Sequence, residues 1–138
     1  VKADDLMLVT LSPLGHSALP STVEAIAERV REIAFTAPFL GEARSLAELH
    51  ADALQRPWPR LGTDRRLARL RWHLIDADDT LAALHSHTKL VPDWAFLQRL
   101  RDAGRQRVAR WFDDCGASLG ARSSFDPLRV FGESASVQ

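Results

Sequence analysis

The stretch Leu6-Met7-Leu8-Val9-Thr10-Leu11 decides the fold class that we expect for this chain. Nearly every residue in it is apolar, and the run is short. A short, continuous apolar run is typical of a strand that is buried on both faces of a parallel sheet. The stretch therefore predicts an interior strand, and with it an α/β protein.

The segment that follows this strand predicts helices. Ser21-Thr22-Val23-Glu24 matches a capping box, in which Ser21 accepts a hydrogen bond from the backbone N–H of Glu24. Pro38 interrupts the helical pattern, so we expect two consecutive helices, the second continuing through Leu54. The first helix has an apolar stripe and a solvated charged face. The stripe consists of Val23, Ile26, Ala27, Val30, Ile33 and Ala34, and the charged face of Glu28, Arg29, Arg31 and Glu32.

A second strand is expected downstream of these helices. Residues 55–63 contain two prolines and a glycine and predict a loop. The alternation of Leu70, Trp72 and Leu74 with their neighbours then predicts a strand that ends near Asp76. Asp76 is expected to cap a short helix over residues 77–87.

The longest helix is expected to begin at Pro92-Asp93 and to end at Gly116 or Gly120. A glycine on its apolar stripe, Gly104, predicts close packing against another element. The stripe consists of Trp94, Leu97, Leu100, Gly104, Val108, Trp111 and Cys115. Residues 126–138 are expected to form a loose tail. The expected fold is therefore α/β and predominantly helical, one domain over residues 1–138 with two short strands, each followed by two helices.

Composition narrows the functional classes. The 138 residues include 18 basic and 18 acidic side chains, so no net charge attracts nucleic acid, and we expect no nucleic-acid partner. The single cysteine, Cys115, excludes an intrachain disulfide and fits a reducing compartment. Neither a transmembrane run nor the pattern of a signal peptide is found in the sequence. We expect a cytoplasmic protein, peripheral to the membrane if it contacts one.

Ser17 is a candidate nucleophile, because Gly15-His16-Ser17 lies between the expected strand and helix. A hydrolase elbow places the serine between two glycines and starts its helix at the nucleophile. Here Leu19 stands in place of the second glycine, and the helix starts about four residues later. Ser17 is therefore interpreted as a loop residue.

Histidines are the candidate metal ligands. His73 has Asp76 three residues on, and His85 and His87 lie at the end of the expected short helix. A metal site needs about three converging ligands, and the chain has one cysteine and no HExxH motif. We expect solvated or hydrogen-bonded histidines, with no metal and no cofactor.

The second half of the chain contains several short motifs in a fixed order. They are His73 with Ile75 at the strand end, an acidic short helix over Asp76 to Leu84, Thr88-Lys89-Leu90, a helix start over Trp94 to Leu97, Arg101-Asp-Ala-Gly-Arg105, and Gly120-Ala-Arg-Ser-Ser124. No single motif is diagnostic, but in their order and spacing the chain resembles the C-terminal region of bacterial patatin-like phospholipases. The first half is similar as well, with a strand, a proline-containing loop and a helix.

The resemblance implies an α/β fold of which this chain is an incomplete piece, and a lipid acyl hydrolase in the full-length protein. Patatin-like enzymes use a serine in a Gly-x-Ser-x-Gly elbow, an aspartate in an Asp-Gly motif and a glycine-rich oxyanion loop. This sequence contains no Asp-Gly motif and no glycine-rich loop, and its one Gly-x-Ser-x-Gly stretch, Gly116 to Gly120 around Ser118, lies at the expected end of the longest helix instead of at a strand-to-helix turn. No catalytic residue is therefore assigned, and the chain is expected to begin just beyond the aspartate. The implied partner is the N-terminal catalytic region of the same protein. The alternative is an independent helical module that binds a protein or a membrane surface.

One basic stretch could contact lipid. Arginine binds phosphate groups through two hydrogen bonds, and tryptophan anchors at the membrane interface. The candidate contacts are Arg56, Trp58, Arg60, Arg65, Arg66 and Arg69, with Arg71 and Trp72 next to them. The alternative interpretation is a solvated loop and strand edge with both tryptophans in the core. Because a sheet of two apolar strands is marginal alone, we also expect pairing with a second copy or another chain.

Overall fold

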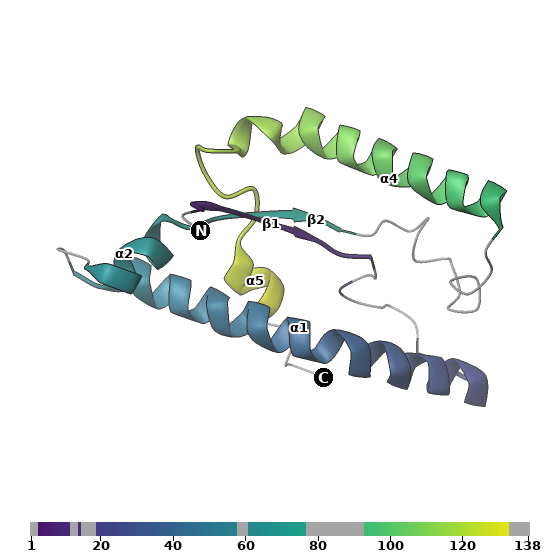
Figure 1. The fold of residues 1–138 in the computed structure, drawn as a ribbon. Helices are drawn as coiled ribbons and strands as arrows, with labels where there is room; N and C mark the ends of the chain where they lie inside the picture. The colour runs from purple at the N-terminus through teal and green to yellow at the C-terminus, as the bar shows by residue number, and fades with distance from the viewer. Residues whose placement is uncertain (1–2, 12–13, 15–18, 58–60, 77–92, 133–138) are drawn as a thin grey trace.

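The computed structural model describes residues 3–11, 14, 19–57, 61–76 and 93–132 (Figure 1). Two short parallel strands pair in register, with Asp5 opposite Arg71 and Val9 opposite Ile75. Helices make up most of the remainder. The elements are β1 (Asp5–Val9), α1 (Val23–Gln55), α2 (Gly62–Arg69), β2 (Arg71–Ile75), α4 (Trp94–Cys115), the 3-10 turn η2 (Gly116–Ser118) and α5 (Pro127–Gly132). The expected α/β class and its helical bias are confirmed, whereas the short helix expected over residues 77–87 lies outside the described residues.

The elements form three layers. The sheet lies between α4 on one face and α1 with α5 on the other (Figure 1). Successive side chains of a strand point to opposite faces. Leu6, Leu8 and Trp72 therefore face α1 and α5, whereas Asp5 and His73 face the α4 side.

The core lies between the sheet and α1. Trp72 is completely buried at its centre, with its ring edge-on to Phe125 and tilted against Phe131. Small residues of α1, Ala43 and Ala47, allow the helix to approach the indole closely. This cluster joins β2, α1 and the C-terminal segment into one unit.

Two predictions about the first helix are wrong. α1 is continuous from Val23 to Gln55 and contains Pro38. The proline removes one backbone hydrogen bond, and its ring is exposed. The helix continues because the residues after Pro38 are buried against the sheet and hold it in place. The N-cap is Thr22 instead of Ser21, and its hydroxyl accepts from the N–H of Ala25 at 3.2 Å.

α4 confirms the predicted long helix. It begins after Asp93, whose carboxylate accepts from the N–H of Ala95, and it ends at Gly116. The close packing predicted for Gly104 is wrong, because a Cβ at this position would meet no atom within 4 Å. Cys115, expected in the core, is half-buried.

The C-terminal segment is ordered further than predicted. Residues Pro127–Gly132 form α5, and Pro127 and Phe131 are buried against α1. The Asp126 carboxylate accepts from the backbone N–H groups of Leu128 and Arg129, which caps the helix. The loose tail expected from residue 126 is therefore wrong up to Gly132, and residues 133–138 lie outside the described part.

β1 is less buried than an interior strand. Val9 is 61% exposed and Leu11 80% exposed, although Leu6 and Leu8 join the core. Among the described elements α4 packs on β2, and Val9, on the α4 side of β1, stays exposed. In the part of the chain that the structure describes, no helix is long and apolar enough to cross a bilayer.

Candidate functional site

A charged cluster joins the beginnings of the two strands. Asp5 is the first residue of β1 and Arg71 the first of β2, and parallel pairing places them opposite each other. The Arg71 guanidinium binds the carboxylate with both prongs, Nε to Oδ1 at 2.9 Å and Nη2 to Oδ2 at 2.6 Å. This two-pronged geometry fixes orientation as well as charge.

Two further donors bind the same carboxylate. His73 Nε2 lies 3.0 Å from Asp5 Oδ1, and the backbone N–H of Gly120 donates to Oδ1 at 3.0 Å. Because an ionised carboxylate only accepts, the His73 Nε2 carries the proton in this pair. Gly120 has a φ of +73°, which suits glycine and turns its N–H toward Asp5. The cluster thus ties β1, β2 and the chain after α4 together.

The environment keeps Asp5 ionised. Hydrogen bonds from Arg71, then from His73 and from the Gly120 backbone, hold the pKa of Asp5 well below its usual range. The carboxylate accepts four hydrogen bonds from these donors, which is about as many as its two oxygens can accept. It is therefore unsuited to serve as a general base, and the cluster is a clamp between strands.

His73 is the most buried polar residue of this cluster. Its side chain is fully buried, and its ring meets Trp111 of α4 edge-on at 5.8 Å. Nδ1 has no hydrogen-bond partner among the described residues. The sequence suggested Asp76 as a neighbour of His73, but Asp76 pairs with Arg107 of α4 instead, and this pair holds α4 against the end of β2.

Nucleophilic chemistry would require a hydroxyl or thiol on His73, and the described residues place none there. Ser123 and Ser124 bind the backbone of Trp72. Ser118, the serine of the Gly116–Gly120 stretch, is buried in η2 directly after a helix, so it does not stand at a strand-to-helix turn. Ser17, His85 and His87 lie outside the described residues. Within the described ranges no group of three or more histidine, cysteine or acidic side chains could hold a metal ion.

The described residues of the basic stretch lie in different settings. Trp72 is in the core, and Arg71 is part of the Asp5 cluster. Arg56 binds Asp52 and Asp64 at 2.7 and 2.9 Å. Trp58 and Arg60 lie outside the described residues. The interpretation that placed both tryptophans in the core is confirmed for Trp72.

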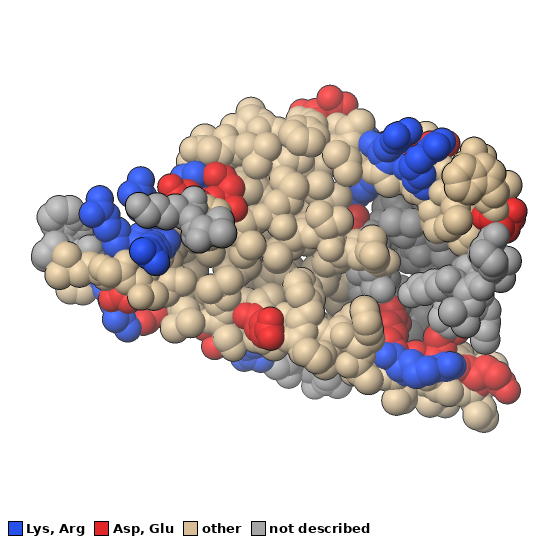
Figure 2. All heavy atoms as spheres, in the orientation of Figure 1, with Lys and Arg blue, Asp and Glu red and all other residues tan. Residues whose placement is uncertain are grey.

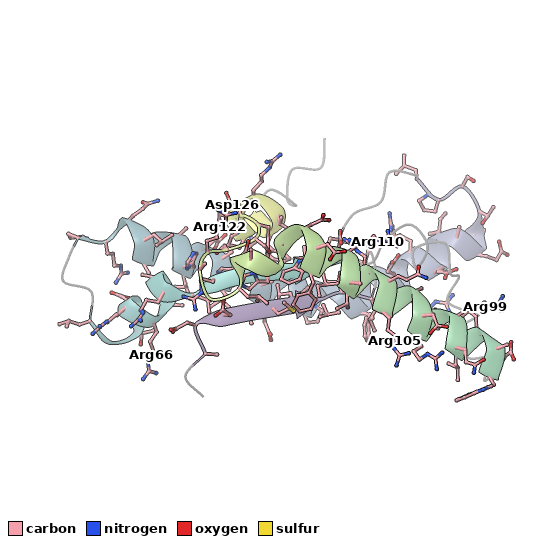
Figure 3. The ribbon with its side chains drawn as sticks, turned by 90° about the horizontal axis from the view of Figure 1, so that it is seen from above. Arg66, Arg99, Arg105, Arg110, Arg122 and Asp126 are labelled. Carbon is pink, nitrogen blue, oxygen red and sulfur yellow. The ribbon has the colours of Figure 1, made fainter. Side chains whose placement is uncertain are left out.

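Three arginines of the stretch remain at the surface, on α2. Arg65, Arg66 and Arg69 are exposed, and Arg69 lies 4.0 Å from Asp4. Figure 2 shows basic side chains gathered at this end of the molecule, and Arg66 points away from it in Figure 3. α2 itself is anchored to α1, because His50 Nδ1 donates to the Leu67 carbonyl at 2.7 Å.

The two edges of the sheet differ. On the outer edge of β2, the Trp72 N–H donates to Ser123 Oγ at 3.0 Å and the Trp72 carbonyl accepts from the Ser124 N–H at 2.8 Å. At the two ends of β1, the Asp4 carbonyl accepts from the Arg71 N–H and the Thr10 N–H donates to the Ile75 carbonyl, so the backbone groups of Asp4 and Thr10 point toward β2. Since neighbouring residues of a strand point their backbone groups to opposite edges, those of Met7 point outward. No described segment pairs with this edge of β1.

The surface beside the open edge carries little charge. β1 lies on the side of the sheet that faces the viewer in Figure 1, as the view from above in Figure 3 also shows. In Figure 2 most of the charged side chains lie toward the two ends of this face, and its centre is largely uncharged, with acidic side chains below it and at the upper margin. Val9 of β1 and Val108 and Phe112 of α4 are exposed apolar residues of these elements.

Sequence reasoning missed the Asp5 cluster, and although it expected the two-stranded sheet to pair with another chain, it did not predict which strand carries the open edge. Asp5 and Arg71 are 66 residues apart, and only the strand register brings them together. The available signal was a charged residue directly before each apolar strand. Compared with known proteins, the chain matches no family model, no curated protein and no solved structure.

Proposed function

We propose that this chain is the non-catalytic C-terminal portion of a patatin-like phospholipase, and that β1 continues the parallel sheet of the catalytic region. The observation that carries the proposal is the asymmetry of the sheet edges. Ser123 and Ser124 occupy the edge of β2, whereas the backbone of β1 at Met7 has no partner among the described residues. A parallel sheet normally continues until both faces and edges are covered.

The largely uncharged centre of the face in Figure 2 supports an extension of the sheet beyond β1. Another strand beside β1, with a helix over it, would cover Val9 of β1 and Val108 of α4 together. The resemblance places the catalytic aspartate shortly before β1, on the chain that would supply such a strand. The serine and aspartate of the dyad would come from that region, and this chain would contribute no group to the chemical step.

In this role the Asp5 cluster is structural and not catalytic. It fixes the register of β1 against β2 at their first residues, so the edge presented to the catalytic region keeps one geometry. The whole enzyme would act in the cytoplasm, at the periphery of the membrane that holds its substrate.

The test is the full-length reading frame. The proposal expects a Gly-x-Ser-x-Gly motif followed by an Asp-Gly motif upstream of Val1, and labelling of the full-length protein by a fluorophosphonate probe. The 138-residue chain alone should stay unlabelled. A reading frame without these motifs, or labelling of the isolated chain at Ser17, would exclude the proposal.

The second candidate is an independent module that binds an anionic membrane surface. The favouring observation is the set of exposed arginines on α2, Arg65, Arg66 and Arg69. Each basic residue near an anionic bilayer contributes about 1 kcal/mol, so three would bind weakly and lose affinity in salt. Co-sedimentation with anionic and neutral vesicles, compared with the triple glutamine variant of these arginines, separates this candidate from the first.

A further inference from the structure

In the N-terminal half of α1, the large apolar residues do not face the sheet and are exposed. Arg29 and Glu32 form an ion pair at 3.3 Å and are half-buried. They lie on the same side of the helix as the buried Ala43, Ala47 and His50, which follow about three turns later. Four branched apolar residues of the same half are exposed instead: Val23 at 77%, Ile26 at 48%, Val30 at 60% and Ile33 at 55%.

The exposed residues form one stripe. Their spacing of three and four repeats as in the seam of a coiled coil, and Ala37 and Gly41 continue it along the helix. A Cβ added at Gly41 would meet nothing within 4 Å, so this end of the stripe is open as well. We call the six residues Val23, Ile26, Val30, Ile33, Ala37 and Gly41 the outer stripe.

The outer stripe is bulky at its N-terminal end and small at its C-terminal end. A twofold axis near the middle of the stripe would place Ile26 on Ala37 of a second copy, and Val23 near its Gly41. Val30 would then meet Ile33 at the centre. An interface that uses the same surface on both partners must be complementary to itself in this way. We propose that the outer stripe pairs two copies of this chain through antiparallel packing of α1.

Charge favours a second copy over a lipid surface. Between Val23 and Gly41 the helix carries three glutamates, Glu24, Glu28 and Glu32, and two arginines, Arg29 and Arg31. This nearly neutral balance gives no attraction to an anionic bilayer and little repulsion between copies. Figure 2 shows both basic and acidic side chains over this half of α1, in agreement with the nearly neutral balance.

The length of the stripe sets the strength of the pairing. A helix segment from residue 23 to residue 41 is about 28 Å long, and two such segments would bury roughly 700 Å² in total. Stable dimers bury at least about 1,200 Å², so this pair forms and separates with concentration. The pairing leaves β1 free and does not depend on the proposed function.

Sedimentation of the 138-residue chain from about 1 µM to about 1 mM tests the proposal. A concentration-dependent dimer is expected, and Val30→Glu should raise its Kd at least about tenfold. Phe35→Glu is the matched control, because Phe35 is exposed on the same half of α1 but lies off the outer stripe. Circular dichroism checks that both variants are folded.

Crosslinking decides the orientation independently of these variants. In a Cys115→Ser background, Ile26→Cys chains should form disulfides with Ala37→Cys chains when the two are mixed, and neither should crosslink with itself. A monomer at every concentration, an equal effect of Phe35→Glu, or crosslinking of Ile26→Cys with itself would overturn the antiparallel pairing. A dimer lost in Met7→Pro but kept in Val30→Glu would overturn it too, and would assign pairing to the edge of β1.

Discussion

Asp5 and Arg71 face each other as the first residues of two parallel strands, joined by two hydrogen bonds of 2.9 and 2.6 Å. Their side chains are 31% and 23% exposed, so water screens the pair only in part. His73 and the Gly120 backbone bind the same carboxylate. One side chain thus links the sheet to the segment that follows α4, and its loss should affect both.

Stability should decrease in acid because of Asp5. Its donors hold the pKa of Asp5 below the ordinary value of 3.8, so the native state favours the ionised form. The stabilisation is complete above the pKa of the unfolded chain, near 4, and disappears as the pH falls toward the lower pKa of the native state. Urea unfolding at several pH values should show this decrease in the wild type and a weaker one in Asp5→Asn.

Asp5→Asn should also lower the free energy of unfolding at pH 7, because an amide replaces the acceptor of four hydrogen bonds. Arg71→Lys is the control that keeps the charge but removes the two-pronged geometry. Its free energy of unfolding should lie between those of the wild type and of Asp5→Asn. A variant Asp5→Asn as stable as the wild type at pH 7 would show that the cluster does not hold the strands.

α5 should contribute to global stability despite its position near the end of the chain. Phe131 is buried against Phe39, Trp72 and Phe125, so Phe131→Ala should reduce the free energy of unfolding by about 3–5 kcal/mol. Leu128→Ala is the matched control in the same helix, because Leu128 is exposed. If Phe131→Ala and Leu128→Ala both had only small effects on thermal unfolding, this segment would be a loose tail, as the sequence suggested.

Local patterns predicted the elements whose burial is local. The alternation around Trp72 located β2, and the spacing of three and four from Trp94 to Trp111 located α4. These signals depend on side chains that repeat within one element. The register between the strands, and hence the contact of Asp5 with Arg71, depends on residues far apart in sequence. The charged residue at the start of each strand was a signal, but it does not say which residues pair.

The apolar stripe of α1 shows where a correct local pattern leads to a wrong assignment. Val23, Ile26, Val30 and Ile33 have helical spacing, and the helix is present, but the stripe does not face the sheet. Periodicity identifies an apolar face and not what covers it. The charged Arg29 and Glu32, expected in solvent, lie on the inner side because the buried alanines further along α1 set the rotation of the helix.

Pro38 should reduce the stability of α1 without dividing it. Its ring lacks the N–H that would bond to the carbonyl four residues earlier, and it is exposed, so no packing depends on it. Pro38→Ala should therefore raise the free energy of unfolding by about 1–3 kcal/mol. Ala37→Pro, one residue earlier in the same helix, is the control with the opposite change, and it should lower the free energy of unfolding. A Pro38→Ala variant that is less stable in thermal unfolding would indicate a native break at this position.

The open edge of β1 should tolerate a proline where the paired edge does not. The N–H of Met7 points away from β2, so Met7→Pro removes no hydrogen bond of the described sheet. Leu8 is the matched neighbour, whose backbone points toward β2 and whose side chain packs in the core. Leu8→Pro is therefore expected to prevent folding of the 138-residue chain, whereas Met7→Pro should keep its circular dichroism spectrum. In the full-length protein of the proposed function, Met7→Pro should instead be destabilising, because the next strand would need that N–H. Equal behaviour of the two variants in the isolated chain would contradict the assignment of the open edge.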